Sequence, residues 1–305
     1  MTSAASLGQV HRASTRTGQK VAVKIQYPAI RAAIENDLKL LRSATLPARM
    51  TGYAPVAIID EVERGFLEET DYLQEGRNIE FFGRKLAGFD YLTIPRVHWD
   101  LTCERVLTMS FVEGEIMGRF LQREPSQAVR DLIGTRLVEL YYTQLHRLRA
   151  LHADHHPGNY LFQPDGRIGL IDFGCVKRIN FDGTDLIRCC VDRTWRQGDK
   201  AAEYVLRIIF GPRIPYARAR KMLPMLEVMT GILYPEGKDA DPMVDFGKAQ
   251  LLNLLTKAMK KVLQDKLTNP EFAFISRAEL GLYSLLHQLN ARVNVRETWR
   301  RNLAT

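Results

Sequence analysis

The sequence of 305 residues lacks any long apolar run, and this shortage excludes several classes of protein. Residues 1–20 are polar and contain no apolar stretch of the kind found in signal peptides. The most apolar late stretch, residues 280–289, is too short to span a membrane and includes Ser284, His287 and Gln288. We therefore predict no transmembrane helix. The expected location is cytoplasmic, with peripheral contact at the inner face of the membrane as a further hypothesis.

Cysteine is also scarce, with four residues at Cys103, Cys175, Cys189 and Cys190. None of them forms a C-x-x-C pair, and two adjacent cysteines are poorly arranged to chelate one metal ion. Reduced thiols in a cytosolic compartment are the simpler interpretation. We assign these cysteines no role.

Positive charge is in excess, with a formal net charge of +8 and a sequence pI near 9.3. This balance favours binding of anions, which include nucleotides, anionic lipids and nucleic acids. No recognised nucleic-acid motif accompanies the charge, so we predict no nucleic-acid partner. Late basic residues could lie on an anionic membrane surface, although an ordinary solvated helix face is the better interpretation. They are Lys257, Lys260, Lys261, Lys266, Arg292, Arg296, Arg300 and Arg301.

The most informative stretch is residues 151–173, which reads LHADHHPGNYLFQPDGRIGLIDF. Asp154 and Asn159 have the spacing H-x-D-x-x-x-x-N, and Asp172 opens a D-F-G sequence, as in kinase-type phosphoryl-transfer sites. Mg²⁺ prefers oxygen ligands, which Asn159 and Asp172 can supply. Asp154 would orient the attacking hydroxyl or water and accept its proton. The alternating residues 160–162 and 167–171 predict two strands joined by a turn at 164–166.

The N-terminal part predicts the phosphate-binding side of such a site. Residues 9–26 form an expected hairpin with a turn at 15–18, and Lys24 stands in V-A-V-K, the form of the kinase lysine that holds nucleotide phosphates. The preceding segment 3–10 is expected to be a loop that approaches the phosphates through small residues. Its candidate nucleotide-binding residues are Ala4, Ala5, Ser6 and Gly8. With one glycine this loop would be stiff, and a frayed terminal tail is the alternative.

Two helices are predicted next, at residues 29–46 and from Pro55 to about Phe82. A phosphate-binding lysine is held by a glutamate on a nearby helix, and Glu75 is the candidate partner of Lys24. Glu69 and Asp71 form a second acidic pair on the same predicted helix. Acidic runs on helices are more often solvated faces.

Strands are expected at residues 92–98 and 105–112, and they end at Glu113, where backbone groups of a kinase hinge would meet adenine. A long amphipathic helix follows at residues 129–148. The chain from residue 184 onward is predicted to be helical throughout. No Ala-Pro-Glu sequence follows Asp172, which argues against peptide phosphorylation. The histidines around Asp154 lack zinc spacing, and we predict no metal besides Mg²⁺.

Taken together, these motifs closely resemble those of the UbiB family of atypical kinase-like proteins, also called the AarF-domain family. The resemblance rests on the alanine-rich segment 4–11, V-A-V-K-I-Q-Y-P at residues 21–28, E-x-D at Glu69 and Asp71, H-A-D-x-H-P-G-N at residues 152–159, and D-F-G at residues 172–174. It covers nearly the whole chain. Family members usually carry a K-x-G-Q helix ahead of the alanine-rich segment, whose lysine approaches the E-x-D carboxylates. This sequence opens at the alanine-rich segment. Either its start is misassigned, or it is a fragment of a longer chain, or the protein lacks this helix, in which case Glu69 and Asp71 would have no regulatory partner.

The resemblance implies an α+β, two-lobed protein-kinase-like fold. Residues 1–114 would form a small β-containing N-lobe with helical inserts, and residues 115–305 a large, mostly helical C-lobe. It further implies ATP and Mg²⁺ binding, with slow ATPase or small-molecule kinase activity in isoprenoid quinone (ubiquinone) biosynthesis or lipid homeostasis. Lys24 and Glu75 would form the ion pair, Asn159 and Asp172 would bind metal, and Asp154 would be the catalytic aspartate.

Partners implied by the resemblance are a lipid or quinone precursor, an anionic membrane surface and quinone-biosynthesis enzymes. Two alternatives stay open. One is a nucleotide-gated scaffold or pseudokinase that regulates a lipid-enzyme complex. The other is a soluble kinase similar to the aminoglycoside phosphotransferases, against which the alanine-rich segment and E-x-D argue.

Overall fold

The computed structural model describes residues 2–5, 8–28, 30–44, 70–180, 183–211, 215–237, 241–263 and 269–304. By their contacts the residues group into two compact units, unit 1 (1–114 with 169–175) and unit 2 (115–168 with 176–305). Strands dominate the N-terminal part and helices the remainder, which confirms the predicted α+β class. Residues 169–175, expected in the C-lobe, group by their contacts with unit 1.

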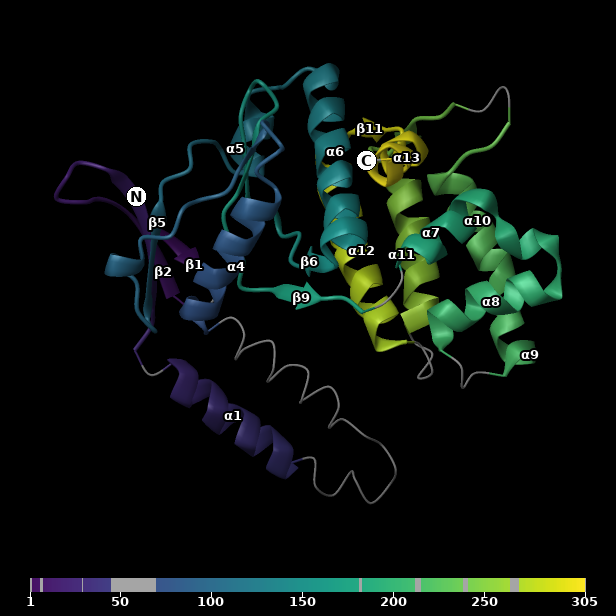
Figure 1. Cartoon of the computed structure of the whole chain (residues 1–305), viewed down its shortest axis with the longest axis horizontal. Coiled ribbons are helices and arrows are strands. Elements are labelled where there is room, and N and C mark those ends of the chain that lie inside the picture. The colour runs from purple at the N-terminus through teal and green to yellow at the C-terminus, as the bar shows by residue number, and fades with distance from the viewer. Residues whose placement is uncertain are drawn as a thin grey trace. The chain divides into compact units, whose positions relative to one another are not determined.

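Unit 1 is built on an antiparallel sheet with the strand order β1-β2-β3-β5 (Figure 1). The strands are β1 (Thr2–Ala5), β2 (Gly8–Ser14), β3 (Lys20–Gln26) and β5 (Val106–Ser110). The predicted hairpin over residues 9–26 is confirmed. Its turn is closed by the Gly18 amide, which donates to the Thr15 carbonyl at 2.9 Å.

The alanine-rich segment differs from its prediction. Ala4 and Ala5 lie in strand β1, paired with Gln9 and Gly8 of β2, so the loop expected over residues 3–10 is wrong for these two positions. A tight hairpin satisfies their backbone groups by pairing rather than leaving them free. Ser6 lies outside the described residues. Gly8 is fixed by packing, because a Cβ there would overlap the backbone oxygen of Ile25.

Helices α1 (Ile30–Ala44) and α4 (Tyr72–Lys85) complete the long elements described in unit 1. The helix predicted from Pro55 to Phe82 lies partly outside the described residues, and its expected passage through Asp71 is wrong. Asp71 is the N-cap of α4, since its Oδ1 accepts the Gln74 amide at 2.9 Å. Such a cap satisfies an amide that the first helical turn leaves unpaired, which fixes where the helix begins.

The strand predicted over residues 92–98 is much shorter in the structure. β4 covers Leu92–Thr93, and a 3₁₀ turn η1 follows at Trp99–Leu101. Pro95 has no amide hydrogen to donate to a neighbouring strand, which explains the interruption. Beyond β4, the described residues 94–98 form one isolated antiparallel bridge, between Val97 and Met109 of β5.

In unit 2 the predicted amphipathic helix is confirmed as α6 (Gln127–Tyr142), which continues as a π-helical segment η2 (Thr143–Leu148). Helices α12 (Pro270–Gln288) and α13 (Val295–Ala304) lie beside α6 (Figure 1). The other helical elements are α5 (Met117–Gln122), α7 (Gly183–Asp192), η4 (Thr194–Gln197), α8 (Asp199–Phe210), α9 (Tyr216–Ala219), η5 (Arg220–Met222), α10 (Leu223–Leu233) and α11 (Ala249–Leu263).

The expectation of helix throughout the last third of the chain is wrong in one place. β10 (Val244–Asp245) and β11 (Arg292–Val293) form a short antiparallel pair. Each strand pairs one β-branched valine with one polar residue. A strand of two residues is too short for its sequence pattern to be distinguished from that of a loop.

The loop that carries the kinase-like motif is bounded by short strands. β6 (Ala150–His152) pairs with β9 (Val176–Arg178) antiparallel. The 3₁₀ turn η3 (Pro157–Asn159) leads into β7 (Tyr160–Phe162), and β8 (Ile168–Leu170) follows. The predicted turn between β7 and β8 is confirmed, because the Gly166 amide donates to the Gln163 carbonyl at 2.9 Å and Gly166 has a φ of 83°.

Candidate functional site

Unit 1 contains a buried cluster of three charged side chains from distant parts of the sequence. Lys24 on β3 donates through Nζ to both carboxylate oxygens of Glu75 on α4, each at 2.9 Å. The same Nζ donates to Oδ2 of Asp172 at 2.8 Å. The structure thus brings together the candidate lysine, its candidate partner and one predicted metal ligand.

The electrostatics of this cluster follow from its burial. The side chains of Lys24 and Glu75 are 10% and 1% exposed, and that of Asp172 is 32% exposed. Burial alone would lower the pKa of Lys24, but the nearby carboxylates of Glu75 and Asp172 outweigh it and hold the pKa above its usual value. Lys24 is therefore charged.

Three residues that the sequence analysis did not single out support this cluster. The Tyr72 ring lies beneath Lys24, with Nζ at 5.4 Å from the ring centroid. Asn78 donates through Nδ2 to the carbonyl of Phe173 at 3.0 Å, and the Phe173 ring packs on Phe82 with centroids 5.4 Å apart. A sequence signal existed, because Tyr72, Glu75, Asn78 and Phe82 recur at helical spacing and therefore share one face of α4.

The second group of candidate residues lies in unit 2. Asp154 is exposed, and the Asn159 Nδ2 donates both to its Oδ2 at 2.8 Å and to its backbone oxygen at 3.1 Å. These hydrogen bonds join the two motif residues, which are five positions apart in the sequence. Because the amide nitrogen of Asn159 is used in this way, its amide oxygen is the atom suited to a metal ligand.

The histidines beside Asp154 anchor its loop. His155 is buried, and its Nδ1 lies 2.7 Å from the Tyr160 hydroxyl, with the two rings stacked. Burial, assisted by His152, lowers the pKa of His155 to about 3, so the ring is neutral at physiological pH. The backbone amide of His152 donates to Oε1 of Gln144 in η2 at 2.8 Å. These contacts support a structural role for His152 and His155.

Comparison with known proteins places this geometry in a family. Residues 2–205 match the ABC1 atypical kinase-like domain. The chain belongs to the ABC1 atypical kinase-like family. This confirms the resemblance to UbiB and AarF-domain proteins that the motifs indicated.

Relatives of this ABC1 chain come from animals and plants. It is 35% identical over 178 residues to AarF domain-containing protein kinase 1 of Mus musculus, covering 56% of this chain and 34% of the relative. It is 38% identical over 180 residues to Protein ACTIVITY OF BC1 COMPLEX KINASE 3, chloroplastic, of Arabidopsis thaliana, covering 57% of this chain and 25% of the relative. The matched region thus spans about a third or less of these curated relatives.

A solved structure extends the likeness to the whole ABC1 chain. This is "The complex structure of Rv3197-erythromycin from Mycobacterium tuberculosis", with 26% identity, a TM-score of 0.72, and coverage of 97% of this chain and 74% of that one. Such a match over almost the full length confirms the kinase-like fold predicted from the motifs.

The acidic residues predicted at the hinge and in E-x-D have separate environments in the ABC1 domain. Glu113 is exposed and its carboxylate lies 3.2 Å from Nζ of Lys20, so its side chain forms a surface ion pair. Asp71 caps α4, as described above, and Glu69 lies outside the described residues. A cation that reached Asp71 would compete with the Gln74 amide for its carboxylate.

The donor set of the ABC1 domain fits Mg²⁺ better than a transition metal. Across the described ranges, no group of three or more His, Cys, Asp or Glu side chains is arranged to hold a metal ion. Mg²⁺ needs no such cage, since it takes one or two carboxylates together with phosphates and water. Asp172, a carboxylate whose side chain is partly exposed, suits such an ion.

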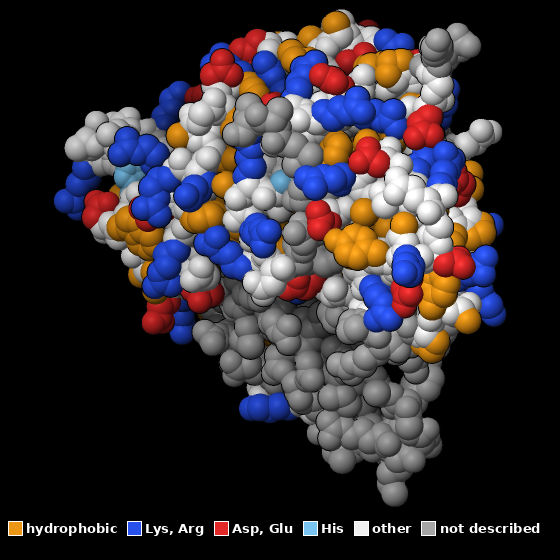
Figure 2. Space-filling view, turned by 45° about the vertical axis from the view of Figure 1, so that its right-hand side comes forward, with side chains coloured by type: hydrophobic (Ala, Val, Ile, Leu, Met, Phe, Trp, Pro, Cys, Tyr) orange, Lys and Arg blue, Asp and Glu red, His pale blue; other side chains and the backbone are white. Residues whose placement is uncertain are grey.

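The surface of the ABC1 chain does not gather its basic residues into one patch on the face shown in Figure 2, where lysine and arginine side chains are interspersed with acidic and hydrophobic ones. Three late arginines have acidic partners: Arg292 with Asp131, Arg296 with Glu236, and Arg301 with Glu297. For the exposed Arg301 on α13, this pairing favours a solvated helix face over a membrane-binding one. None of the helices in the described part of the chain is both long and apolar enough to span a bilayer.

Proposed function

We propose that this chain is an ATP-dependent atypical kinase or ATPase that uses Mg²⁺ and transfers the terminal phosphoryl group slowly, to a small molecule or to water. Lys24, held by Glu75, would contact the nucleotide phosphates. Asn159 and Asp172 would hold Mg²⁺, which supplies positive charge to the phosphates when bound. The backbone around Ala4, Ala5, Ser6, Gly8 and Glu113 would contact the nucleotide.

The observation that carries this proposal is the cluster of Lys24, Glu75 and Asp172. A buried lysine bound by a helix glutamate and by the aspartate of D-F-G is the arrangement that kinase-type sites require. A purely structural ion pair has no need of a third, partly exposed carboxylate.

In the transfer step, Asp154 would orient the acceptor hydroxyl and accept its proton as oxygen forms a bond to phosphorus and the bond to ADP breaks. Asn159 holds the Asp154 carboxylate through its amide, which fixes the direction of the accepting oxygen. The missing Ala-Pro-Glu sequence supports a small molecule or water as the acceptor rather than a peptide.

Membership of the family supports a role in isoprenoid quinone biosynthesis or lipid homeostasis. The proposed partners are a lipid or quinone precursor and the enzymes that process it, with peripheral contact at an anionic membrane. Glu69 and Asp71 are proposed as regulatory carboxylates near the nucleotide.

A second candidate, a nucleotide-gated scaffold, is favoured by one detail of the cluster. The Lys24 ammonium has three hydrogens and three carboxylate acceptors, namely both oxygens of Glu75 and Oδ2 of Asp172. Binding of a phosphate to Lys24 therefore requires that one of these acceptors be given up. Nucleotide binding would thus change the contacts of the D-F-G segment, which a scaffold could report without turnover.

The test is to measure thermal stability and phosphate release with and without Mg-ATP for the wild type, Asp172→Asn and a control, Asp165→Asn. Asp165 lies in the exposed turn before β8 and pairs with Arg167. At a hundredfold the dissociation constant, Mg-ATP should stabilise the wild type and the control by about 2.7 kcal/mol, and this gain should be lost in Asp172→Asn.

Stabilisation together with phosphate release supports the enzyme, and stabilisation alone supports the scaffold. If Mg-ATP stabilises none of the three proteins, both candidates are wrong. If it stabilises Asp172→Asn as strongly as the wild type, the metal-binding role of Asp172 is wrong.

A further inference from the structure

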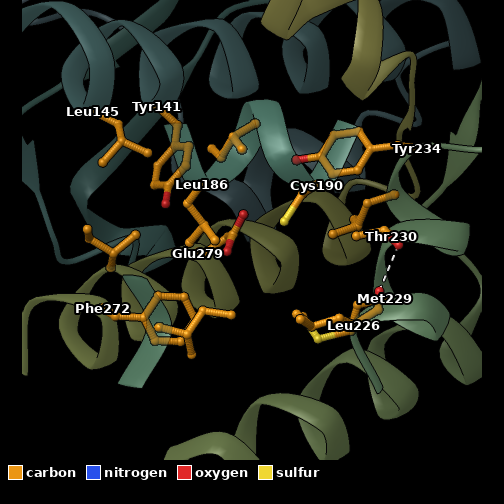
Figure 3. Close-up of a pocket in the computed structure, with 14 residues that line it drawn as sticks. Tyr141, Leu145, Leu186, Cys190, Leu226, Met229, Thr230, Tyr234, Phe272 and Glu279 are labelled. Atoms are coloured by element: carbon orange, nitrogen blue, oxygen red, sulfur yellow. Dashed lines mark hydrogen bonds between the residues drawn. The ribbon is translucent and has the colours of Figure 1, made fainter. Parts of the chain in front are cut away.

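Unit 2 contains a partly open cavity of about 70 Å³ that none of the proposed nucleotide-binding residues line. Helices α6, α7, α8, α10 and α12 and the segment η2 contribute its walls (Figure 3). The lining is dominated by aliphatic and aromatic side chains, such as Leu226, Met229 and Phe272. Among the 14 described residues that line it there is no lysine, arginine or histidine.

Two polar groups open into this apolar space. The carboxyl group of Glu279 accepts one hydrogen bond, from the Tyr283 hydroxyl at 2.7 Å. Tyr141 is 1% exposed, and its hydroxyl has no hydrogen-bond partner within the part of the chain that the structure describes. In Figure 3 this hydroxyl is directed toward Leu186 and Glu279. A buried hydroxyl without a partner costs free energy, which a ligand in the cavity would recover.

Among the residues that the structure describes, no cation balances the charge of Glu279. Burial raises the pKa of this carboxyl to about 7, against the effect of the hydrogen bond from Tyr283. The titratable groups that face it come from α6, α7, the end of α10 and α12, and none of them becomes a cation. They are Tyr141, Tyr142, Cys190, Tyr234 and Tyr283. Glu279 is partly buried, and a carboxylate in such a position without a cationic partner favours a ligand that supplies a positive charge.

We propose that this cavity is a binding site for a small aliphatic amine, whose ammonium group pairs with Glu279 and donates to the Tyr141 hydroxyl oxygen. The hydrocarbon chain would lie against Leu226, Met229 and Phe272. Because an apolar cavity of about 150 Å³ accepts benzene, a cavity of about 70 Å³ suits a chain of two or three carbon atoms better than a ring system.

A neutral alcohol of the same shape is the informative comparison. Its hydroxyl could donate to Glu279 and accept from Tyr141, and its chain would bury the same apolar surface. What it lacks is the charge. A preference for the amine over the alcohol therefore measures the contribution of the unbalanced carboxylate.

The test uses the full chain without nucleotide, labelled with ¹³C at the methionine methyl groups and titrated at pH 7.5 with ethylamine or ethanol. Ethylamine should shift the Met229 signal saturably and leave that of Met117, buried elsewhere in α5, unchanged. Because hydrogen bonds to charged groups are stronger than neutral ones, we expect ethylamine to bind about tenfold more tightly than ethanol. Glu279→Gln should remove this preference.

Glu271→Gln, on the same helix but outside the cavity, should preserve the preference and serves as the matched control. Leu226→Phe, which fills the cavity, should weaken both ligands. If Glu279→Gln does not fold, the comparison of the two ligands on the wild type still decides. Equal affinity for ethylamine and ethanol, or no change at Met229 with ethylamine, would overturn the proposal. Because no nucleotide is present, this outcome is independent of ATP binding.

Discussion

Glu75 in unit 1 and Glu279 in unit 2 are both glutamates on helices whose carboxyl groups face the protein interior, but their partners differ. Glu75 receives two hydrogen bonds from the Lys24 ammonium, which also binds Asp172. Glu279 receives one, from the neutral Tyr283 hydroxyl. Burial raises the pKa of both carboxyl groups, and at Glu75 the positive charge of Lys24 opposes this rise.

The difference shows two ways of placing a carboxyl group in a low-dielectric interior. A charged partner compensates for lost hydration but couples the two residues, so that removal of one leaves the other unpaired. Without a charged partner, the carboxyl group shifts its pKa toward neutrality and becomes sensitive to pH and to cationic ligands. The first arrangement suits a preformed phosphate-binding lysine. The second arrangement suits a site that binds a cationic ligand as the counter-ion of the carboxylate.

The largest expected effect comes from breaking the paired arrangement. Lys24→Met should destabilise the nucleotide-free protein by about 3 to 5 kcal/mol, because Glu75 and Asp172 lose their shared cation in a buried site. Chemical denaturation would measure this loss. Lys20→Met on the same strand is the control, since Lys20 forms an exposed pair with Glu113 and its removal should cost less than about 1 kcal/mol.

Adding Glu75→Gln to Lys24→Met should recover part of the stability, because one of the two carboxyl groups left without a cation is then neutral. A loss for Lys24→Met no larger than that for Lys20→Met would contradict the importance of the buried pair.

The next effect acts on the unpaired carboxyl and depends on pH. The pKa of Glu279 is raised from 4.5 to about 7 by folding, so the folded protein binds more protons than the unfolded chain between these values. Stability of the wild type should therefore fall as pH rises through this window and level off above it. Relative to the wild type, Glu279→Gln should gain at most about 3 kcal/mol between pH 4.5 and pH 8.

Urea denaturation at several pH values would measure the change, with Glu271→Gln as a control that should show no comparable trend. A wild type and a Glu279→Gln variant whose stabilities run parallel over the whole window would show that Glu279 is not an unbalanced buried carboxyl.

The smallest effect concerns the helix that carries Glu75. Asp71→Ala removes the acceptor for the Gln74 amide at the start of α4 and should cost about 1 kcal/mol. Asp71→Asn, which retains an acceptor oxygen, should cost less, and denaturation midpoints would compare the two variants. Should both be as stable as the wild type, the cap does not contribute to holding Glu75 in place.

Much of the candidate site was predictable because its motifs are local or its partners follow fixed spacings. Asp154 and Asn159 are five residues apart on one short loop, so their contact follows from a tight turn. The pairing of Lys24 with Glu75 was expected from a strand lysine followed by a helix with a buried face. The start of α4 was missed, although Asp71 and Gln74 have the spacing of a capping box, because the apolar pattern seemed to continue through it.

The sequence by itself determined the strand, helix and loop that carry Lys24, Glu75 and Asp154, because hydrophobic periodicity and turn residues act over a few positions. Only the tertiary structure decided which distant groups meet. It placed Ala4 and Ala5 in a paired strand, brought Asp172 to the same ammonium as Glu75, and enclosed Glu279 among helices that span residues 127 to 288. Such contacts form between side chains that are far apart in the sequence and are buried together. A local sequence pattern therefore does not predict which buried carboxyl group will have a cationic partner.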